Sequence, residues 1–88
     1  MKTYYQKRFL KDLASIPSKP RHQIEKFVFE EVLRFQSINE SEKLQRMTGY
    51  PTYYKIRFGV YLVGLKKEND SLIFIRALHR KEIYRYFP

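Results

Sequence analysis

The spacing of apolar residues changes once along this chain, from a helical period to a period of two, and this change most strongly constrains the fold. Up to Phe35, apolar side chains recur every three or four positions, as on one face of an α-helix. From Tyr54 onward they alternate with polar or small residues, as on a strand with one buried face. Helices followed by strands predict an α+β domain, with two N-terminal helices packed on a small antiparallel sheet.

Two helices are predicted before residue 37, each with one apolar face directed to the core. Pro17 ends the first helix, Ser18 is a candidate N-cap for the second, and Pro20 suits its first turn. Residues 1–5 fit either a short edge strand or the start of the first helix. The apolar stripes are Tyr5, Phe9, Leu10, Leu13 and Ile16 in the first helix, and Ile24, Phe27, Val28, Val32 and Phe35 in the second.

The polar segment 37–53 contains Asn39, Gly49 and Pro51, and it is predicted to be a loop with one short helical turn near residues 42–46. Three strands follow, joined by short connections that favour antiparallel neighbours. One face of this sheet is predicted to pack under the helices and the other to be free. The alternating apolar sets are Ile56 and Phe58, then Tyr61, Val63 and Leu65, then Ile73, Ile75 and Ala77.

Length and composition exclude several classes of protein. We expect residues 1–88 to form a single domain whose 8 Tyr and 7 Phe supply much of its core. The chain has no cysteine and only two histidines, so we expect no disulfide, no metal site and no bound cofactor, and a reducing compartment. No apolar run approaches the roughly 20 residues that span a bilayer, and the first residues form no signal peptide, which predicts a cytoplasmic protein without a membrane partner.

The positive charge of the chain lies mainly in its second half. The net charge is +9; residues 1–42 carry 8 basic and 6 acidic side chains, whereas residues 43–88 carry 10 basic and 3 acidic ones. A surface with this bias suits a polyphosphate partner, an acidic protein, or both. The alternative interpretation is an ordinary solvated basic surface.

Cations on the first predicted strand and in the C-terminal tail are the candidate functional residues. If Ile56 points to the core, Lys55 and Arg57 both point outward, about 7 Å apart on the strand. In the tail, Arg80 can bind a phosphate through two donors, and Tyr84 offers a phenol for proton transfer and a ring for stacking. A packed aromatic is the alternative for Tyr84.

His79 is a candidate auxiliary acid or base, because imidazole titrates near neutral pH. The alternative is a structural histidine with its nitrogens satisfied inside the fold.

In this order, these elements resemble the RelE/ParE superfamily of bacterial toxins, most closely its RelE-like messenger-RNA endonucleases. The resemblance covers nearly the whole chain. It rests on the two helices, the polar loop with Lys43-Leu44, a Tyr-Lys-Ile-Arg strand, a Gly-x-Tyr-x-Val strand and the closing His-Arg-Lys-x-Ile-Tyr. It implies a RelE-like fold and a catalytic set made of Lys55, Arg57, Arg80 and Tyr84.

The resemblance also implies a mechanism and partners. The chain would be the toxin of a type II toxin–antitoxin system, an mRNA interferase that cleaves message in the ribosomal decoding site. Cleavage would proceed by metal-free attack of the 2′-hydroxyl on the adjacent phosphorus, with Tyr84 or Lys55 near the hydroxyl, Arg57 near the phosphate, and Arg80 near the phosphate or the leaving oxygen. The partners would be the ribosome, its mRNA and a cognate antitoxin, with operator DNA bound only through the antitoxin complex.

One position departs from the family pattern. Where the family usually has an arginine after the tyrosine of the second strand, this chain has Leu62, so the resemblance implies a weakened or silent enzyme. One alternative is that Leu62 only packs and that Lys66 or Arg76 supplies the charge. Another is that the leucine was introduced to disable a lethal nuclease.

Two other functions stay open at this point. The chain could be a ParE-like inhibitor of DNA gyrase, or a noncatalytic basic module that binds nucleic acid or an acidic partner. The ribonuclease hypothesis requires Lys55, Arg57, Arg80 and Tyr84 to converge on one hollow of the surface.

Overall fold

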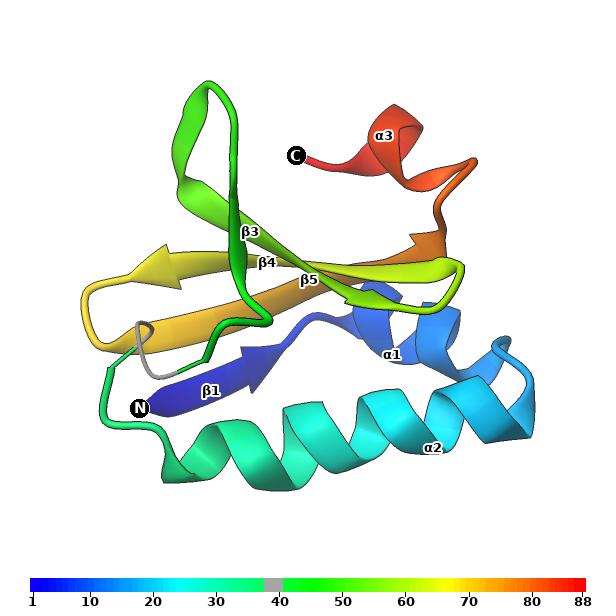
Figure 1. Cartoon of the computed structure of the whole chain (residues 1–88), viewed down its shortest axis with the longest axis horizontal. Helices are drawn as coiled ribbons and strands as arrows, with labels where there is room; N and C mark the ends of the chain where they lie inside the picture. Colours follow the sequence, from blue (N-terminus) through cyan, green and yellow to red (C-terminus); the bar gives the residue numbers. More distant parts are fainter. Residues whose placement is uncertain (38–40) are drawn as a thin grey trace.

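The computed structural model describes residues 1–37 and 41–88, and it places the helices and strands in three layers. Five strands form one sheet in the order β1-β5-β4-β3-β2, with α1 and α2 on one face and α3 on the other (Figure 1). Residues 38–40, including Asn39 of the predicted loop, lie outside the described residues. The elements are β1 (Lys2–Tyr5), α1 (Lys7–Ala14), α2 (Ser18–Lys26), β2 (Gln45–Met47), β3 (Tyr50–Phe58), β4 (Tyr61–Glu68), β5 (Ser71–His79) and α3 (Ile83–Tyr86).

Both N-terminal helices are confirmed. The second continues beyond α2 through a π-helical turn, Phe27–Glu31, and a 3-10 turn, Val32–Arg34. The predicted capping role of Ser18 is wrong, because Pro17 occupies the N-cap position and no side chain caps this helix. Pro17 has an extended backbone conformation, and its carbonyl accepts the first helical hydrogen bond from the Arg21 amide at 2.9 Å.

The three predicted strands form an antiparallel meander, β3-β4-β5, as expected. The open question about residues 1–5 is answered by β1, an edge strand that pairs in parallel with β5 from Lys2 opposite Ser71 to Tyr5 opposite Phe74. The sheet is therefore antiparallel except for this pair. Parallel neighbours need a long connection between them, and between β1 and β5 this connection includes α1 and α2, which cross one face of the sheet.

The predicted loop at 37–53 is partly wrong. Gln45 and Arg46 do not continue a helical turn; they pair with Lys55 and Tyr54 as the short strand β2. Gly49, with φ of 82°, lies in the tight turn that returns the chain into β3. Three strand residues with a register shift between Arg46 and Met47 are too few to show a period of two.

A β-bulge changes the predicted alternation along β5. Gly64 lies opposite Arg76 and Leu65 opposite Phe74, so Ile75 is an extra residue on β5. Phe74 and Ala77 therefore both point to the helices, at 0% and 1% exposure, and the predicted single face of Ile73, Ile75 and Ala77 is wrong.

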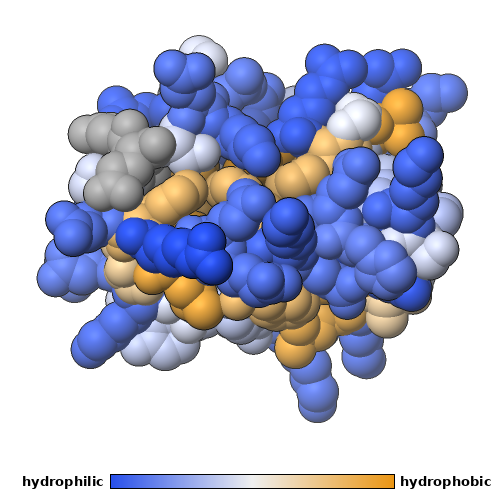
Figure 2. All heavy atoms as spheres, turned by 60° about the horizontal axis from the view of Figure 1, so that its bottom comes forward, coloured by the Kyte–Doolittle hydropathy of each residue, from blue (hydrophilic) through white to orange (hydrophobic). Residues whose placement is uncertain are grey.

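The main core lies between the sheet and the two helices. Its buried residues come mainly from α1, from α2 with the two helical turns that continue it, and from the inner face of β3, β4 and β5. They include the closely packed rings of Phe9 and Phe74. On the helical side, polar side chains surround strips of exposed apolar surface (Figure 2). Leu10 and Leu33, at 44% and 51% exposure, are among the exposed apolar residues.

The outer face of the sheet, the face opposite α1 and α2, is not wholly free as predicted. A second apolar cluster forms there, in which Met47 and Leu62 pack with Ile83 and Phe87. Leu62 leaves apolar surface on this face, and α3 with the following Phe87 removes it from water. No helix within residues 1–37 and 41–88 combines the length and the apolar composition that crossing a bilayer requires.

Candidate active site

A pocket of about 320 Å³ opens on the outer face of the sheet, between β2, β3, β4 and the C-terminal segment. The four predicted catalytic residues all contribute to it, and they come from positions far apart in the sequence. The structure therefore meets the geometric condition that the ribonuclease hypothesis requires. The pocket is lined by Gln45, Lys55, Arg57, Leu62, Arg80 and Tyr84.

Strand β3 presents two cations to the pocket because the residue between them belongs to the core. Ile56 is fully buried, whereas Lys55 is partly exposed and Arg57 exposed. In the ladder, Lys55 lies opposite Gln45 of β2, and Arg57 lies opposite Leu62 of β4. The pleat of a well-packed strand thus fixes the direction of both cations.

The turn between β3 and β4 positions the two arginines. Arg57 Nε donates a hydrogen bond to the Gly59 carbonyl at 3.0 Å. The Arg80 amide donates to the Val60 carbonyl at 2.8 Å, which ties the start of the tail to the same turn. Within the part of the chain that the structure describes, no carboxylate forms an ion pair with Lys55, Arg57 or Arg80. The pocket therefore keeps a positive charge that an anion could neutralise.

Helix α3 carries the tyrosine of the site. Ile83 and Phe87 are buried at 1% and 3% exposure, whereas Tyr84 is 57% exposed. Lys55 Nζ donates a hydrogen bond to the Tyr84 hydroxyl at 3.1 Å and lies 5.6 Å from the centre of its ring. The buried residues on either side of Tyr84 thus hold its phenol above the cation of β3.

Gly64 makes the docking of this segment possible, and Gly64→Ala should disturb it. A Cβ at this position would lie 2.6 to 2.7 Å from ring atoms of Phe87. We expect Gly64→Ala to displace Phe87 and to lower the free energy of unfolding by about 1–3 kcal/mol, as overpacking does. Urea unfolding measures this loss. Phe87→Leu in the same variant should restore part of it, and an unchanged unfolding curve for Gly64→Ala would contradict the proposed contact.

His79 does not line the pocket. Its Nδ1 accepts a hydrogen bond from the Lys81 amide at 3.1 Å, and its ring packs edge-on against Tyr61 at 5.7 Å between ring centres. This arrangement favours the structural interpretation, in which His79 shapes the turn that leads to α3.

Gln45 is the lining residue that sequence reasoning missed. It lies on β2, opposite Lys55, and its side chain is exposed at the mouth of the pocket. The segment was predicted to be a loop, and a lone glutamine in such a segment carries no signal of a binding role. Only the pairing of β2 with β3 reveals its position.

Comparison with known proteins identifies the family. No protein-family model matches the chain. Over 89 aligned residues that cover 100% of both proteins, it is 42% identical to Toxin RelE3 of Methanocaldococcus jannaschii. The chain belongs to the RelE family of toxins.

Solved RelE structures have the same fold. The structure of the RelB-RelE antitoxin–toxin complex from Methanococcus jannaschii matches with a TM-score of 0.81 and 41% identity, over 97% of this chain and 99% of the other. The isolated E. coli RelE toxin matches with a TM-score of 0.68 and 20% identity, over 96% and 90%, which shows the shared fold alone. The expected RelE family is confirmed, and its members are not confined to bacteria, because Methanocaldococcus jannaschii is an archaeon.

Leu62 occupies the position where the resemblance to RelE ribonucleases implies an arginine. Its side chain is 7% exposed and packs with Met47, Ile83 and Phe87, while one edge borders the pocket. Leu62 therefore helps to dock α3 on the sheet. This observation supports a packing role, whatever charge the position carries in other RelE proteins.

The two cations considered as replacements for that arginine are engaged elsewhere. Lys66 Nζ lies 2.9 Å from a Glu68 carboxylate oxygen, and this hydrogen bond raises the pKa of Lys66 above its usual range. Arg76 forms an ion pair with Asp12 at 2.7 Å. Neither Lys66 nor Arg76 lines the pocket. The cations that line it in this RelE chain are Lys55, Arg57 and Arg80.

Proposed function

We propose that this RelE-family chain is an endoribonuclease that cleaves messenger RNA in the ribosomal decoding site. The observation that carries the proposal is the meeting of Lys55, Arg57, Arg80 and Tyr84 in one pocket, with no carboxylate among the described residues pairing with its cations. Positive groups fixed around a hollow suit the negative charge that builds on a phosphate in the transition state.

The proposed reaction needs only groups of the protein and of the RNA. The 2′-hydroxyl oxygen attacks the adjacent phosphorus, the bond to the 5′-oxygen breaks, and the products are a 2′,3′-cyclic phosphate and a 5′-hydroxyl. Either Tyr84 or Lys55, in its deprotonated form, accepts the proton of the 2′-hydroxyl, and this proton is passed on to the 5′-oxygen as it leaves. Arg57 faces the phosphate oxygens, and Arg80 faces the phosphate or the leaving oxygen. The 3.1 Å contact between Lys55 and Tyr84 means that each candidate base has the other as its hydrogen-bond partner.

An antitoxin is the proposed protein partner. Relatives in this family have been solved as complexes with RelB antitoxins, including those from Methanococcus jannaschii and E. coli. The positive charge of residues 43–88 and the exposed apolar strips on the helical side suit an acidic, partly disordered segment that folds on contact. We propose that the chain acts in the cytoplasm and meets operator DNA only through this complex.

Primer extension on a message under translation tests the function. We expect new 5′ ends within codons only when the purified chain is added to a translating extract. Cleavage of the same RNA without ribosomes should be far slower, because the ribosome supplies part of the alignment. Inhibition of gyrase supercoiling without RNA cleavage would favour the ParE-like alternative, and RNA binding with neither effect would favour a noncatalytic basic module.

Leu62→Arg tests whether the leucine weakens the enzyme. If an arginine here contacts the transition state, its gain should raise the cleavage rate by about 10²-fold, the usual effect of one such contact. The same change removes a buried apolar side chain, so we expect the free energy of unfolding to fall by about 2 kcal/mol. The rate is measured by primer extension at a temperature where both proteins remain folded.

Leu62→Met is the matched control for this variant, because it changes the shape of the side chain without adding charge. It should leave the rate close to that of the starting protein. If Leu62→Arg cleaves no faster at an equal folded fraction, the hypothesis of a weakened enzyme is wrong.

A further inference from the structure

Helix α3 depends on contacts with the rest of the molecule. It has four residues, Ile83–Tyr86, and a helix of this length is unstable by itself in water. Its exposed Tyr84 belongs to the candidate site, so the contacts that hold α3 also set where the phenol lies. On one side these contacts are apolar, made by Ile83 and Phe87.

On its other side α3 rests on a cation of β5. The guanidinium of Arg76 lies over the ring of Tyr86, with 4.9 Å from its carbon to the ring centre. Tyr86 is 53% exposed, and the guanidinium covers part of its ring. Arg76 thus contributes a contact that holds this side of α3.

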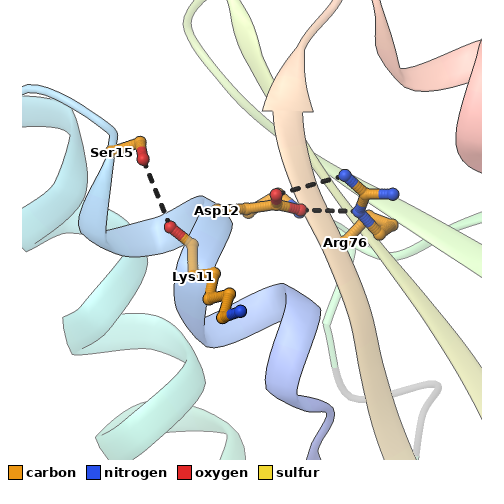
Figure 3. Close-up of polar contacts among 5 residues, drawn as sticks. Lys11, Asp12, Ser15 and Arg76 are labelled. Atoms are coloured by element: carbon orange, nitrogen blue, oxygen red, sulfur yellow. Dashed lines mark hydrogen bonds and ion pairs between the residues drawn. The ribbon is translucent and has the colours of Figure 1, made fainter.

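Asp12 of α1 fixes that guanidinium. Its carboxylate accepts hydrogen bonds from Arg76 Nε at 2.7 Å and from Arg76 Nη2 at 3.2 Å (Figure 3). Both side chains are only 12% exposed, and the Asp12 bond raises the pKa of Arg76. Two donors on one carboxylate hold the planar group in a single orientation.

The same carboxylate also accepts a hydrogen bond from the edge of β5 beyond the end of β1. The pairing of β1 with β5 ends at Phe74, and beyond it the Ala77 amide donates to Asp12 Oδ2 at 3.1 Å. The bulge on β5 turns Arg76 toward the outer face, where it lies opposite Gly64 and close to α3. Asp12 therefore connects the helical layer, the edge of β5 and the outer face.

We propose that the Asp12–Arg76 pair is a positioning element of the candidate site, which holds Tyr86 and thereby places the Tyr84 hydroxyl at Lys55. Neither Asp12 nor Arg76 lines the pocket, so the pair acts through α3 and not on RNA. The consequence for cleavage rests on the function proposed above. The consequence for the docking of α3 does not.

Tyr86→Leu tests the proposal without removing the ion pair. We expect the Phe87 amide, which donates to the Ile83 carbonyl at 2.9 Å, to lose about 2- to 30-fold of its protection from hydrogen exchange, the range for loss of one cation–π contact. We expect kcat for message cleavage to fall by about 10-fold, up to ~10²-fold for a displacement near 1 Å, with KM little changed. Tyr4→Leu is the matched control, since Tyr4 is also 53% exposed but lies on β1; it should change neither quantity.

Asp12→Asn is the second variant, because it keeps the shape of the side chain and weakens its hold on Arg76. It should lower the protection of the same Phe87 amide. The double variant of Asp12→Asn and Tyr84→Phe should cleave no more slowly than Tyr84→Phe alone, because the pair is proposed to act through Tyr84. Unchanged protection of the Phe87 amide in both Tyr86→Leu and Asp12→Asn would overturn the proposal, as would losses of rate that add to that of Tyr84→Phe. If the starting protein cleaves no message, the proposed function fails, and the exchange measurement alone decides whether the pair positions α3.

Discussion

Arg57→Ala should slow message cleavage by about 10² to 10³-fold, the usual cost of removing one charge contact from a transition state. Arg57 is exposed on β3, faces the pocket, and is held by a hydrogen bond to the Gly59 carbonyl. Its removal leaves the core intact, so the free energy of unfolding should change by no more than about 0.5 kcal/mol. Single-turnover primer extension on programmed ribosomes measures the rate, and urea unfolding checks the fold.

Arg85→Ala is the control for that prediction. Arg85 is an exposed cation on α3 that does not line the pocket, so the variant removes the same charge at a different place. Its cleavage rate should remain within a few-fold of the starting protein. Equal losses in the two variants would mean that the total charge of the surface matters and that Arg57 has no special place at the phosphate.

Phe74→Ala should have the largest effect on stability, lowering the free energy of unfolding by about 3–5 kcal/mol. Phe74 is fully buried on β5; its ring stacks with Tyr5 at 5.4 Å and packs against Phe9 at 5.6 Å between ring centres. It therefore joins β1, α1 and β5. Since a domain of this kind has only about 5–15 kcal/mol of stability in total, the variant should be partly unfolded under mild conditions.

Urea unfolding followed by circular dichroism measures this loss. Val60→Ala is the control, because Val60 is 41% exposed in the turn between β3 and β4 and should change stability by about 0.5 kcal/mol or less. A loss below about 1 kcal/mol for Phe74→Ala would show that the aromatic cluster is not part of the cooperative core.

Long periodic segments made most of the fold predictable. The helices and the strands β3, β4 and β5 repeat their apolar pattern over several turns or alternations, and each was predicted with the right type. The elements that escaped are short. β2 has three residues and α3 has four, so neither repeats any pattern, and the bulge at Ile75 is a local event that alternation hides.

Part of the candidate site was also predictable, because some of its residues are recognised from local geometry and side-chain chemistry. The outward direction of Lys55 and Arg57 follows from strand geometry. Arg80 and Tyr84 were candidates because of their side-chain chemistry, and the resemblance to the RelE family placed all four residues in one set. The packing of Leu62 under α3 and the place of Gln45 at the pocket depend on how the tail and β2 dock, which are contacts between distant segments. Catalytic roles for these residues stay predictions until the variants are measured.

The parallel pairing of β1 with β5 has a consequence for how the molecule is made. The partners, from Lys2 with Ser71 to Tyr5 with Phe74, lie at nearly opposite ends of the sequence. During synthesis, β1 must wait for β5 to emerge before it can pair, and contacts of such long sequence separation form slowly. A nascent chain arrested before β5 would thus lack both the partner of β1 and the segment that carries Tyr84, so its candidate site would be incomplete.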